Sequence, residues 1–234
     1  MKQPETALIV GAGSGLSASL ARLFAREGMR VAAAARDTAK LGPLAKETGA
    51  LALACDAADP VQVEAMFAAV ETKWGVPDLV VYNAGYRVRG PFVGLDPKEV
   101  ERTIRVTGYA GFLVAQSAAK RMLPRGSGAV FFTGASASVK GYAESAPFAM
   151  GKFALRGLAQ SMGRELAPKG IHVAHFVIDG GVRNAEKGRV EGANRAADSY
   201  LDPDAIAQSY LHVVQQPRSA WTWEVELRPW VERF

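Results

Sequence analysis

Three glycines, Gly11, Gly13 and Gly15, follow a short apolar run at residues 6–10 and precede a helical pattern of leucines. Glycine has no Cβ, so a turn of this kind lets backbone N–H groups approach a ligand closely at the amino end of the helix. These N–H groups and the positive end of the helix favour a phosphate group. Glycine-rich turns also occur for structural reasons alone. The position directly after the first strand favours a site for the pyrophosphate of a dinucleotide.

A second chemical signal lies at the end of the next apolar run, where Ala35 is followed by Arg36. In dinucleotide-binding folds an acidic residue at this place accepts the ribose 2′-hydroxyl of NAD and would repel a 2′-phosphate. Ala35 supplies no carboxylate, and the Arg36 guanidinium can bind a phosphate through charge-assisted hydrogen bonds. We therefore predict NADP(H) in preference to NAD(H). The alternative is that Arg36 is an ordinary exposed charge.

Several motifs, in chain order, resemble those of the short-chain dehydrogenase/reductase family. Gly11 and Gly15 match two glycines of the family's GxxxGxG pattern, and Ser17 stands where the third glycine usually is. YNAG at residues 82–85 matches the family's NNAG except in its first residue. FAMGK at residues 148–152 occupies the place of the family's YxxxK helix. The resemblance extends over nearly the whole chain.

This resemblance implies a set of cofactor-binding residues. Asp56 matches the acidic residue that contacts adenine, and Lys152 matches the lysine that binds the nicotinamide ribose. The expected cofactor-binding residues are Gly11, Gly13, Ser14, Gly15, Leu16, Arg36, Asp56, Asn83, Ala84, Gly85, Lys152, Gly180 and Val182.

The residues expected to catalyse the reaction depart from the family's pattern. In the family, the lysine lowers the pKa of a tyrosine, which gives a proton to a carbonyl oxygen as hydride arrives. Phe148 stands in the place of that tyrosine, one helical turn before Lys152, and cannot donate a proton. Thr107 replaces an asparagine, and ungapped spacing puts Ala135 at the catalytic serine's position, with Ser136 adjacent. Because a general acid contributes roughly 10²- to 10⁴-fold in rate, we expect weakened carbonyl reduction unless another group replaces it.

Two tyrosines are candidate proton donors. Tyr142 precedes the helix in a loop that borders the substrate pocket in the family, and Tyr86 follows the NAG motif. Each could instead be an ordinary half-buried aromatic residue. A substrate that needs no protein proton donor, such as an activated double bond protonated by water, is a further alternative.

Two functions therefore stay open. The first is an NADP(H)-dependent oxidoreductase that acts on a small carbonyl compound, an alcohol or an activated double bond. The alternative is a catalytically silent NADP(H)-binding sensor or partner protein, as the loss of the tyrosine suggests. The resemblance also implies a homodimer or homotetramer formed through the long helices and the final strand.

Apolar runs and helical patterns alternate along the chain, and this alternation must position the chemical residues. Strands alternating with helices predict a single α/β domain over residues 1–234. Its doubly wound parallel sheet has helices on both faces, in the three-layer α/β/α arrangement of the Rossmann fold. We expect strands at residues 6–10, 31–35, 51–54, 79–82, 129–133, 171–178 and 221–227. We expect helices at residues 16–27, 38–48, 60–74, 97–123, 148–167 and from 203 onward.

Local signals refine two of these segments. Asp96 can cap the helix that begins at Pro97, with Glu99 at the spacing of a capping box, and the helix is expected to break near Gly108. Residues 179–201 are rich in Gly, Ala, Arg and Asn without an apolar period. We interpret them as a loop, a mobile substrate loop within the domain.

Composition indicates which partners are expected. The net charge is +5 over 234 residues, but Lys and Arg are scattered without a basic run, so we expect no nucleic-acid partner. Arg87, Arg89 and Lys140 are accordingly interpreted as solvated loop charges rather than as an anion site. The amino-terminal apolar run is too short for a signal peptide, and no stretch is long enough for a membrane span. We expect a soluble cytoplasmic protein.

Three remaining residues are assigned to the core. The only cysteine, Cys55, has no histidine next to it in sequence and is expected to be a small buried side chain at a strand end. His172 and His175 lie three residues apart on one strand, so they point to opposite faces. No carboxylate lies at metal-ligand spacing from them, and no metal site is predicted.

Overall fold

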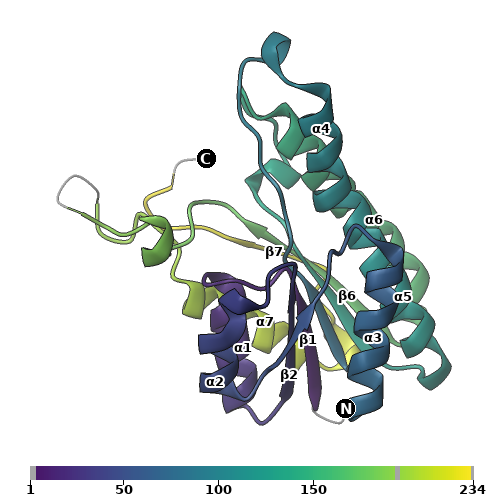
Figure 1. Ribbon diagram of the computed structural model, residues 1–234. Helices are drawn as coiled ribbons and strands as arrows, with labels where there is room; N and C mark the ends of the chain where they lie inside the picture. Colours follow the sequence, from purple (N-terminus) through teal and green to yellow (C-terminus); the bar gives the residue numbers. More distant parts are fainter. Residues whose placement is uncertain (1–3, 193–195, 233–234) are drawn as a thin grey trace.

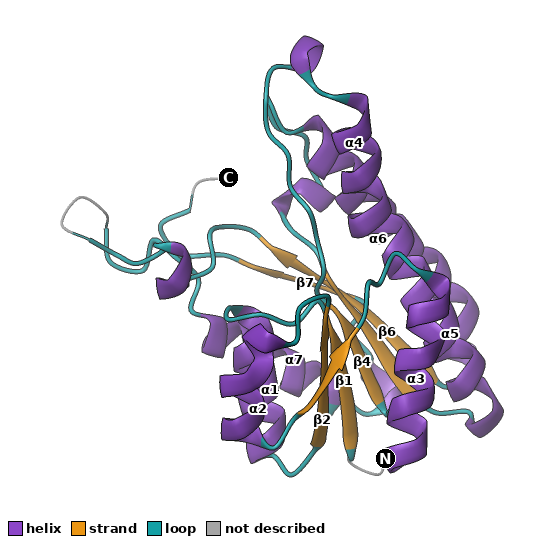
Figure 2. Ribbon diagram, viewed as in Figure 1, coloured by secondary structure: helices purple, strands orange, loops and turns teal. Residues whose placement is uncertain are grey.

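Seven parallel strands form one sheet in the computed structural model, which describes residues 4–192 and 196–232. The strands lie in the order β3-β2-β1-β4-β5-β6-β7 (Figure 2). This order confirms the predicted doubly wound sheet, because the chain moves outward from β1 in one direction and from β4 in the other. The bounds are β1 (Thr6–Val10), β2 (Arg30–Ala35), β3 (Leu51–Ala54), β4 (Leu79–Tyr82), β5 (Gly128–Thr133), β6 (Ile171–Ile178) and β7 (Glu224–Leu227).

Helices cover both faces of the sheet and produce the three predicted layers (Figure 1). Strands covered on both sides are continuous apolar runs, and β1, β4 and β6 are buried along their whole length. One face is covered by α1 (Leu16–Arg26), α2 (Gly42–Thr48) and α7 (Pro203–Val214). The other face is covered by α3 (Pro60–Trp74), α5 (Ala110–Met122) and α6 (Ala146–Leu166), and α4 (Pro97–Ile104) extends beyond the carboxyl edge of the sheet.

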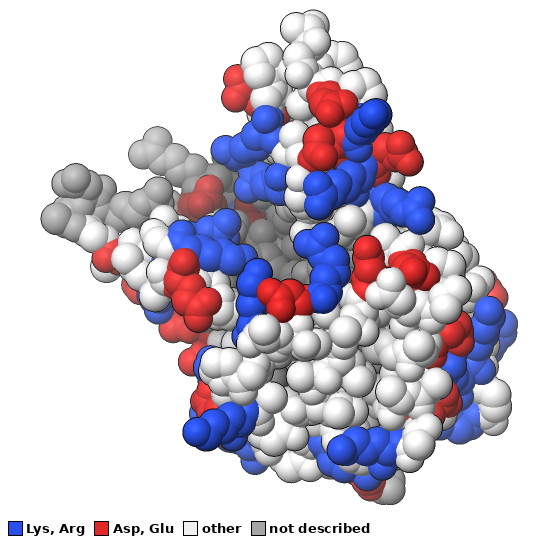
Figure 3. Space-filling model, viewed as in Figure 1, with Lys and Arg blue, Asp and Glu red and all other residues white. Residues whose placement is uncertain are grey.

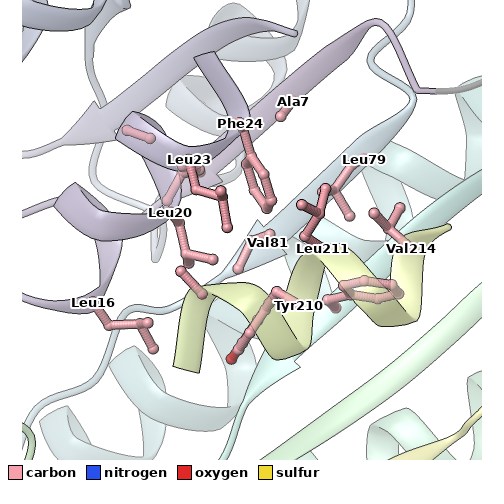
Figure 4. Packing of buried hydrophobic residues seen from close by; sticks show 14 of the residues in the cluster. Ala7, Leu16, Leu20, Leu23, Phe24, Leu79, Val81, Tyr210, Leu211 and Val214 are labelled. Carbon is pink, nitrogen blue, oxygen red and sulfur yellow. The ribbon is translucent and has the colours of Figure 1, made fainter. Parts of the chain in front are cut away.

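The packing of α1 fixes the position of the glycine turn at its amino end. Leu20, Leu23 and Phe24 lie on one stripe of α1 and pack beside α7 over the sheet (Figure 4). In α7, the Tyr210 ring stacks on Phe176 of β6 with centroids 3.6 Å apart. Burial of such side chains stabilises the fold by roughly 1.5–3 kcal/mol each. The start of α1 is therefore held rigidly against the sheet.

A π-helical turn, Arg105–Tyr109, separates α4 from α5, where the sequence predicts a break. The buried Tyr82 hydroxyl donates a hydrogen bond to the backbone carbonyl of Val106 in this turn. The helix after this turn also packs closely on α6, since a Cβ on Gly111 would lie 2.5 Å from Leu155 Cδ1. Turns of this type concentrate at functional sites. The residue that departs from the NNAG motif, Tyr82, thus joins β4 to the irregular turn through its hydroxyl.

Several predicted boundaries differ from the structure. β2 and β5 begin one residue earlier than predicted, α1 and α6 end one residue earlier, and α2 begins at Gly42, after a 3₁₀ turn at Ala39–Leu41, rather than at residue 38. Helix α6 begins at Ala146, two residues before the predicted start at 148, because Pro147 is tolerated in a first helical turn. The last strand begins at Glu224 rather than at residue 221. Trp221 instead stacks on His172 with ring centroids 4.6 Å apart, and its indole N–H donates to the carbonyl of Gln216. These side-chain contacts hold residue 221 outside the strand ladder.

The segment 179–201 is irregular, as predicted, apart from a short 3₁₀ turn at Ala185–Lys187. Arg183 is fixed by ion pairs to Glu191 and Asp202, at 2.8 Å and 3.0 Å. Residues 193–195 of the predicted loop lie outside the described residues, and the mobility of the segment stays a prediction. In residues 4–192 and 196–232, no helix has the length and apolar character needed to span a membrane.

Candidate active site

The glycine turn lies at the carboxyl end of β1, against the start of the segment that follows β4. Gly11 has a φ of +86°, and a Cβ there would lie 2.4 Å from the backbone nitrogen of Ala84. The N–H groups of Gly11 and Ala12 both donate to the carbonyl of Ala34, at 3.0 Å and 2.9 Å. The prediction that Gly11 offers a bare N–H group is therefore wrong. Gly11 is needed because only glycine fits this close approach of two backbones.

The next three residues of the turn keep their N–H groups available. Among the described residues, no partner accepts a hydrogen bond from the backbone N–H of Gly13, Ser14 or Gly15. The space beside Gly13 is open, since a Cβ there would meet nothing within 4 Å. The side chain of Leu16 is buried in the core, so only its backbone faces the turn. Free N–H groups at the start of α1 fit the pyrophosphate of a dinucleotide.

Ser17 connects this turn to the YNAG segment. Its hydroxyl donates to the carbonyl of Gly11 at 3.1 Å, and the Asn83 side chain donates to that hydroxyl at 2.7 Å. The sequence predicts only that Ser17 is small enough to replace glycine. Its hydrogen bonds add a link between the ends of β1 and β4. Asn83 thereby positions the turn.

Asn184 is a site residue that the sequence patterns do not reveal. Its side chain is buried, donates to the Ser14 hydroxyl at 3.3 Å, and lies 3.1 Å from where a Cβ of Gly15 would be. No motif spacing marks an asparagine in an irregular loop. Before it, Gly180 packs against Pro229, and Val182 forms a bridge to Leu201, so these predicted residues fix the base of the segment.

Two residues lie where an adenosine would be expected, at the ends of β2 and β3. Arg36 is exposed and forms no ion pair with any described residue. Asp56 accepts a hydrogen bond from the N–H of Ala58 at 3.0 Å through one oxygen, Oδ1. A cation without a carboxylate partner beside the glycine turn favours an additional phosphate. These residues fit the adenosine end of a dinucleotide.

Lys152 lies deep at the same edge of the sheet. Its side chain is buried, and its ammonium donates to the carbonyl of Thr133 at 2.6 Å. Burial lowers the pKa of Lys152 to about 8. Lys152 Nζ and Thr107 Oγ1 lie 3.9 Å and 4.0 Å from the point where Gly85 would carry a Cβ. The α6 lysine and the hydroxyl of the π-helical turn therefore converge on the YNAG segment.

The other predicted catalytic residues, Thr107, Ser136 and Phe148, lie on different elements around Lys152. The Thr107 hydroxyl accepts a hydrogen bond from the N–H of Tyr86 at 3.2 Å. Ser136 begins a 3₁₀ turn after β5, and its hydroxyl has no hydrogen-bond partner among the described residues. The half-buried Phe148 lies one turn before Lys152, with its ring centroid 5.7 Å from Lys152 Nζ.

The two tyrosines proposed as proton donors lie in different surroundings. The Tyr86 hydroxyl donates to Glu99 Oε2 at 2.6 Å and accepts from Arg102 at 3.3 Å. The bond to Glu99 raises the pKa of Tyr86. Glu99 is thus committed to Tyr86, and the capping-box prediction is wrong for Glu99, although Asp96 does cap α4. Tyr142 is 42% exposed, with Lys140 Nζ 5.6 Å from its ring centroid.

The residues assigned to the core lie there. Cys55 is buried, and burial raises the pKa of its thiol to about 11, which disfavours a reactive thiolate. His172 bonds to the carbonyl of Thr222 at 2.8 Å, and His175 bonds to Glu224 Oε2 at 2.9 Å. Burial lowers the pKa of both histidines below the usual value, that of His175 to about 4. Both histidines are therefore neutral near pH 7 and stabilise the edge of the sheet.

A doubly wound parallel sheet with a glycine turn and free N–H groups after β1 is typical of nucleotide-binding α/β proteins. The family model for short chain dehydrogenases matches residues 5–187 of the chain. The protein belongs to the short-chain dehydrogenase/reductase family and is an oxidoreductase of that family. The chain is 29% identical over 174 residues to D-threitol dehydrogenase of Mycolicibacterium smegmatis. The aligned region covers 72% of this chain and 67% of that protein.

Solved structures agree with this assignment. A short-chain dehydrogenase from Rhodopseudomonas palustris is 35% identical, with a TM-score of 0.84 over 97% of this chain and 99% of that one. An alcohol dehydrogenase from the archaeon Thermococcus sibiricus, complexed with 5-hydroxy-NADP, is 24% identical, with a TM-score of 0.86 over 98% of each chain. The second similarity shows the shared fold.

Proposed function

We propose that this protein is an NADP(H)-dependent oxidoreductase that acts on a small carbonyl compound, the corresponding alcohol or an activated double bond. One observation carries the proposal: a turn with three free N–H groups lies beside Arg36, which has no acidic partner among the described residues. In this arrangement the turn would hold the pyrophosphate, Arg36 the 2′-phosphate and Lys152 the nicotinamide ribose. When bound, the nicotinamide would supply hydride chemistry at the substrate carbon, and a residue of this chain would exchange a proton at the substrate oxygen.

Cofactor preference is tested by replacing Arg36 with glutamine. Loss of a charge-assisted contact of about 1.5–3 kcal/mol is expected to weaken NADPH binding about 10- to 100-fold. NADH lacks the 2′-phosphate, so its affinity is expected to change by less than about threefold. Isothermal titration calorimetry with both nucleotides measures the two changes. Equal losses for NADPH and NADH, or wild-type protein that binds NADH as tightly as NADPH, would contradict the assignment.

The proton donor in our proposal is Tyr142. Phe148 has no hydroxyl, and the Tyr86 hydroxyl is committed to Glu99. Tyr142 is exposed, and the Lys140 ammonium lies 5.6 Å from its ring centroid, so its hydroxyl is open to a substrate. The other residues have separate roles in this proposal: Lys152 orients the cofactor, and Ser136 contacts the substrate oxygen.

Replacing Tyr142 with phenylalanine is expected to lower kcat by roughly 10²- to 10⁴-fold, because a general acid is lost. NADPH affinity is expected to stay within about twofold of the wild-type value. Tyr86→Phe is the matched control and should leave kcat nearly unchanged. A screen of ketones, aldehydes and enones, followed by NADPH absorbance, supplies the substrate for this comparison. Unchanged kcat in Tyr142→Phe together with a large loss in Tyr86→Phe would reverse the assignment.

The second candidate function is a catalytically silent NADP(H)-binding protein. The observation in its favour is Phe148, because this side chain offers no proton one helical turn before Lys152. The same screen separates the two candidates when Phe148→Tyr is included. Turnover by the wild type supports the enzyme, and turnover by the variant alone supports the silent protein.

We also propose a homodimer or homotetramer built through the long helices. Large apolar side chains are exposed on the π-helical turn, α5 and α6, at Tyr109 (45%), Phe112 (41%), Met150 (52%) and Phe153 (45%). Exposed apolar faces of this kind are typical of interfaces. The single domain over residues 1–234, the cytoplasmic location and the substrate-loop role of residues 179–201 stay predictions.

A further inference from the structure

Arg87, which the sequence leaves as a solvated loop charge, packs over the ring of Phe148. Its Cζ atom lies 5.0 Å from the ring centroid, and Lys152 Nζ lies 5.7 Å from the same centroid. Because both distances end on one ring, Arg87 lies near the place where Lys152 is proposed to hold the nicotinamide ribose. A small substrate that meets this end of the cofactor can therefore reach Arg87.

Two further guanidinium groups act on Arg87. Burial and the positive charges of Arg89 and Arg189 lower the pKa of Arg87. Within the described part of the chain, none of these three arginines forms an ion pair. Glu144, whose backbone carbonyl accepts a hydrogen bond from Gly90, does not pair with them either. The cluster is therefore an excess of positive charge that no carboxylate of residues 4–192 and 196–232 balances through an ion pair.

Lys140 differs from this cluster, although the sequence places it in the same group of loop charges. Its ammonium lies 3.8 Å from the buried carboxylate of Asp179, so its charge is already balanced. The third arginine of the cluster is Arg189, from the irregular segment after β6. Figure 3 shows Lys and Arg side chains around the rim of a hollow between the projecting α4 region and the main body.

We propose that Arg87, supported by Arg89 and Arg189, binds an anionic group on the substrate, either a carboxylate or a phosphate monoester. A guanidinium that stacks on an aromatic ring keeps its edge N–H groups free, and these match two oxygens of such a group. The bound anion offsets the mutual repulsion of the three arginines. The inference rests on the proposed function, and it gives the substrate its class: a small carbonyl compound or alcohol with a negative charge.

The test uses matched pairs of charged and neutral probes with the protein saturated by NADPH. The pairs are acetoacetate with methyl acetoacetate, and dihydroxyacetone phosphate with dihydroxyacetone. Calorimetry is expected to show at least one charged probe binding at least tenfold more tightly than its neutral partner. Arg87→Gln is expected to abolish that preference by weakening the charged probe about 10- to 100-fold. The pair that shows the preference identifies the anion as carboxylate or phosphate.

Arg26→Gln is the control, because Arg26 is an exposed arginine at the end of α1, far from Phe148 in sequence and fold. It should bind every probe as the wild type does. Equal affinity of the wild type for charged and neutral probes overturns the inference, as does a preference that survives in Arg87→Gln. A separate NADPH titration on the same samples tests the proposed function. If NADPH fails to bind, the probes titrated into the protein alone still decide the role of Arg87.

Discussion

Replacing Gly11 with alanine is expected to abolish measurable NADPH binding and to lower the free energy of unfolding by about 2–4 kcal/mol. The φ of +86° is strained for any residue with a Cβ, and the new methyl carbon would lie 2.4 Å from the backbone nitrogen of Ala84. Backbone atoms cannot rotate away as a flexible side chain can. The turn must therefore separate from the YNAG segment, which misplaces the free N–H groups. Urea unfolding and calorimetry with NADPH measure the two losses.

Gly13→Ala is the matched control within the same turn. A Cβ at Gly13 would meet nothing within 4 Å, so stability is expected to change by less than about 1 kcal/mol. The added methyl group projects into the space reserved for the pyrophosphate, and NADPH affinity is expected to fall. The pair of variants thus separates folding from ligand approach. Full stability in Gly11→Ala, or unchanged NADPH affinity in both variants, would contradict this description of the turn.

The strands were predictable where burial alone decides the structure. β1, β4 and β6 have the predicted bounds, because a strand covered on both faces is largely apolar along its whole length. The start of β7 was not predictable in the same way. Alternating residues from 221 onward fit a strand, but the stacking of Trp221 on His172 depends on a residue 49 positions earlier, and no local pattern contains that contact.

The candidate site shows the same division. The positions of the glycine turn, Arg36 and Lys152 follow from motifs, because each motif is defined by its distance from a strand or helix end. The partners of each group do not follow from the sequence. Which amide of the turn is free depends on the hydrogen bonds to Ala34, and the Tyr86–Glu99 bond joins the loop after β4 to helix α4. Side-chain partners far apart in the sequence are set by tertiary packing, so the sequence alone could not decide between Tyr86 and Tyr142 as the proton donor.

Replacing Lys152 with methionine is expected to make the protein more stable and less able to bind its cofactor. Burial lowers the pKa of Lys152 from 10.5 to about 8, so the folded state disfavours the charged form. Near pH 7 the lysine is charged in both states, and the folded chain bears the full cost of burying it. Methionine removes that cost, and the expected gain is about 1–3 kcal/mol after the hydrogen bond to Thr133 is lost.

The pH dependence fixes the sign of this effect. Between about pH 8 and pH 10.5 the unfolded chain binds more protons than the folded chain, so wild-type stability rises with pH. The advantage of Lys152→Met should therefore shrink across this window and vanish above it. NADPH affinity should fall about tenfold or more near pH 7, where Lys152 is protonated, because the ribose loses a charged donor. Lys98→Met, on the exposed surface of α4, is the control and should match the wild type in both measurements. A Lys152→Met variant that is less stable at pH 7, or that binds NADPH normally, would show that Lys152 serves the fold rather than the cofactor.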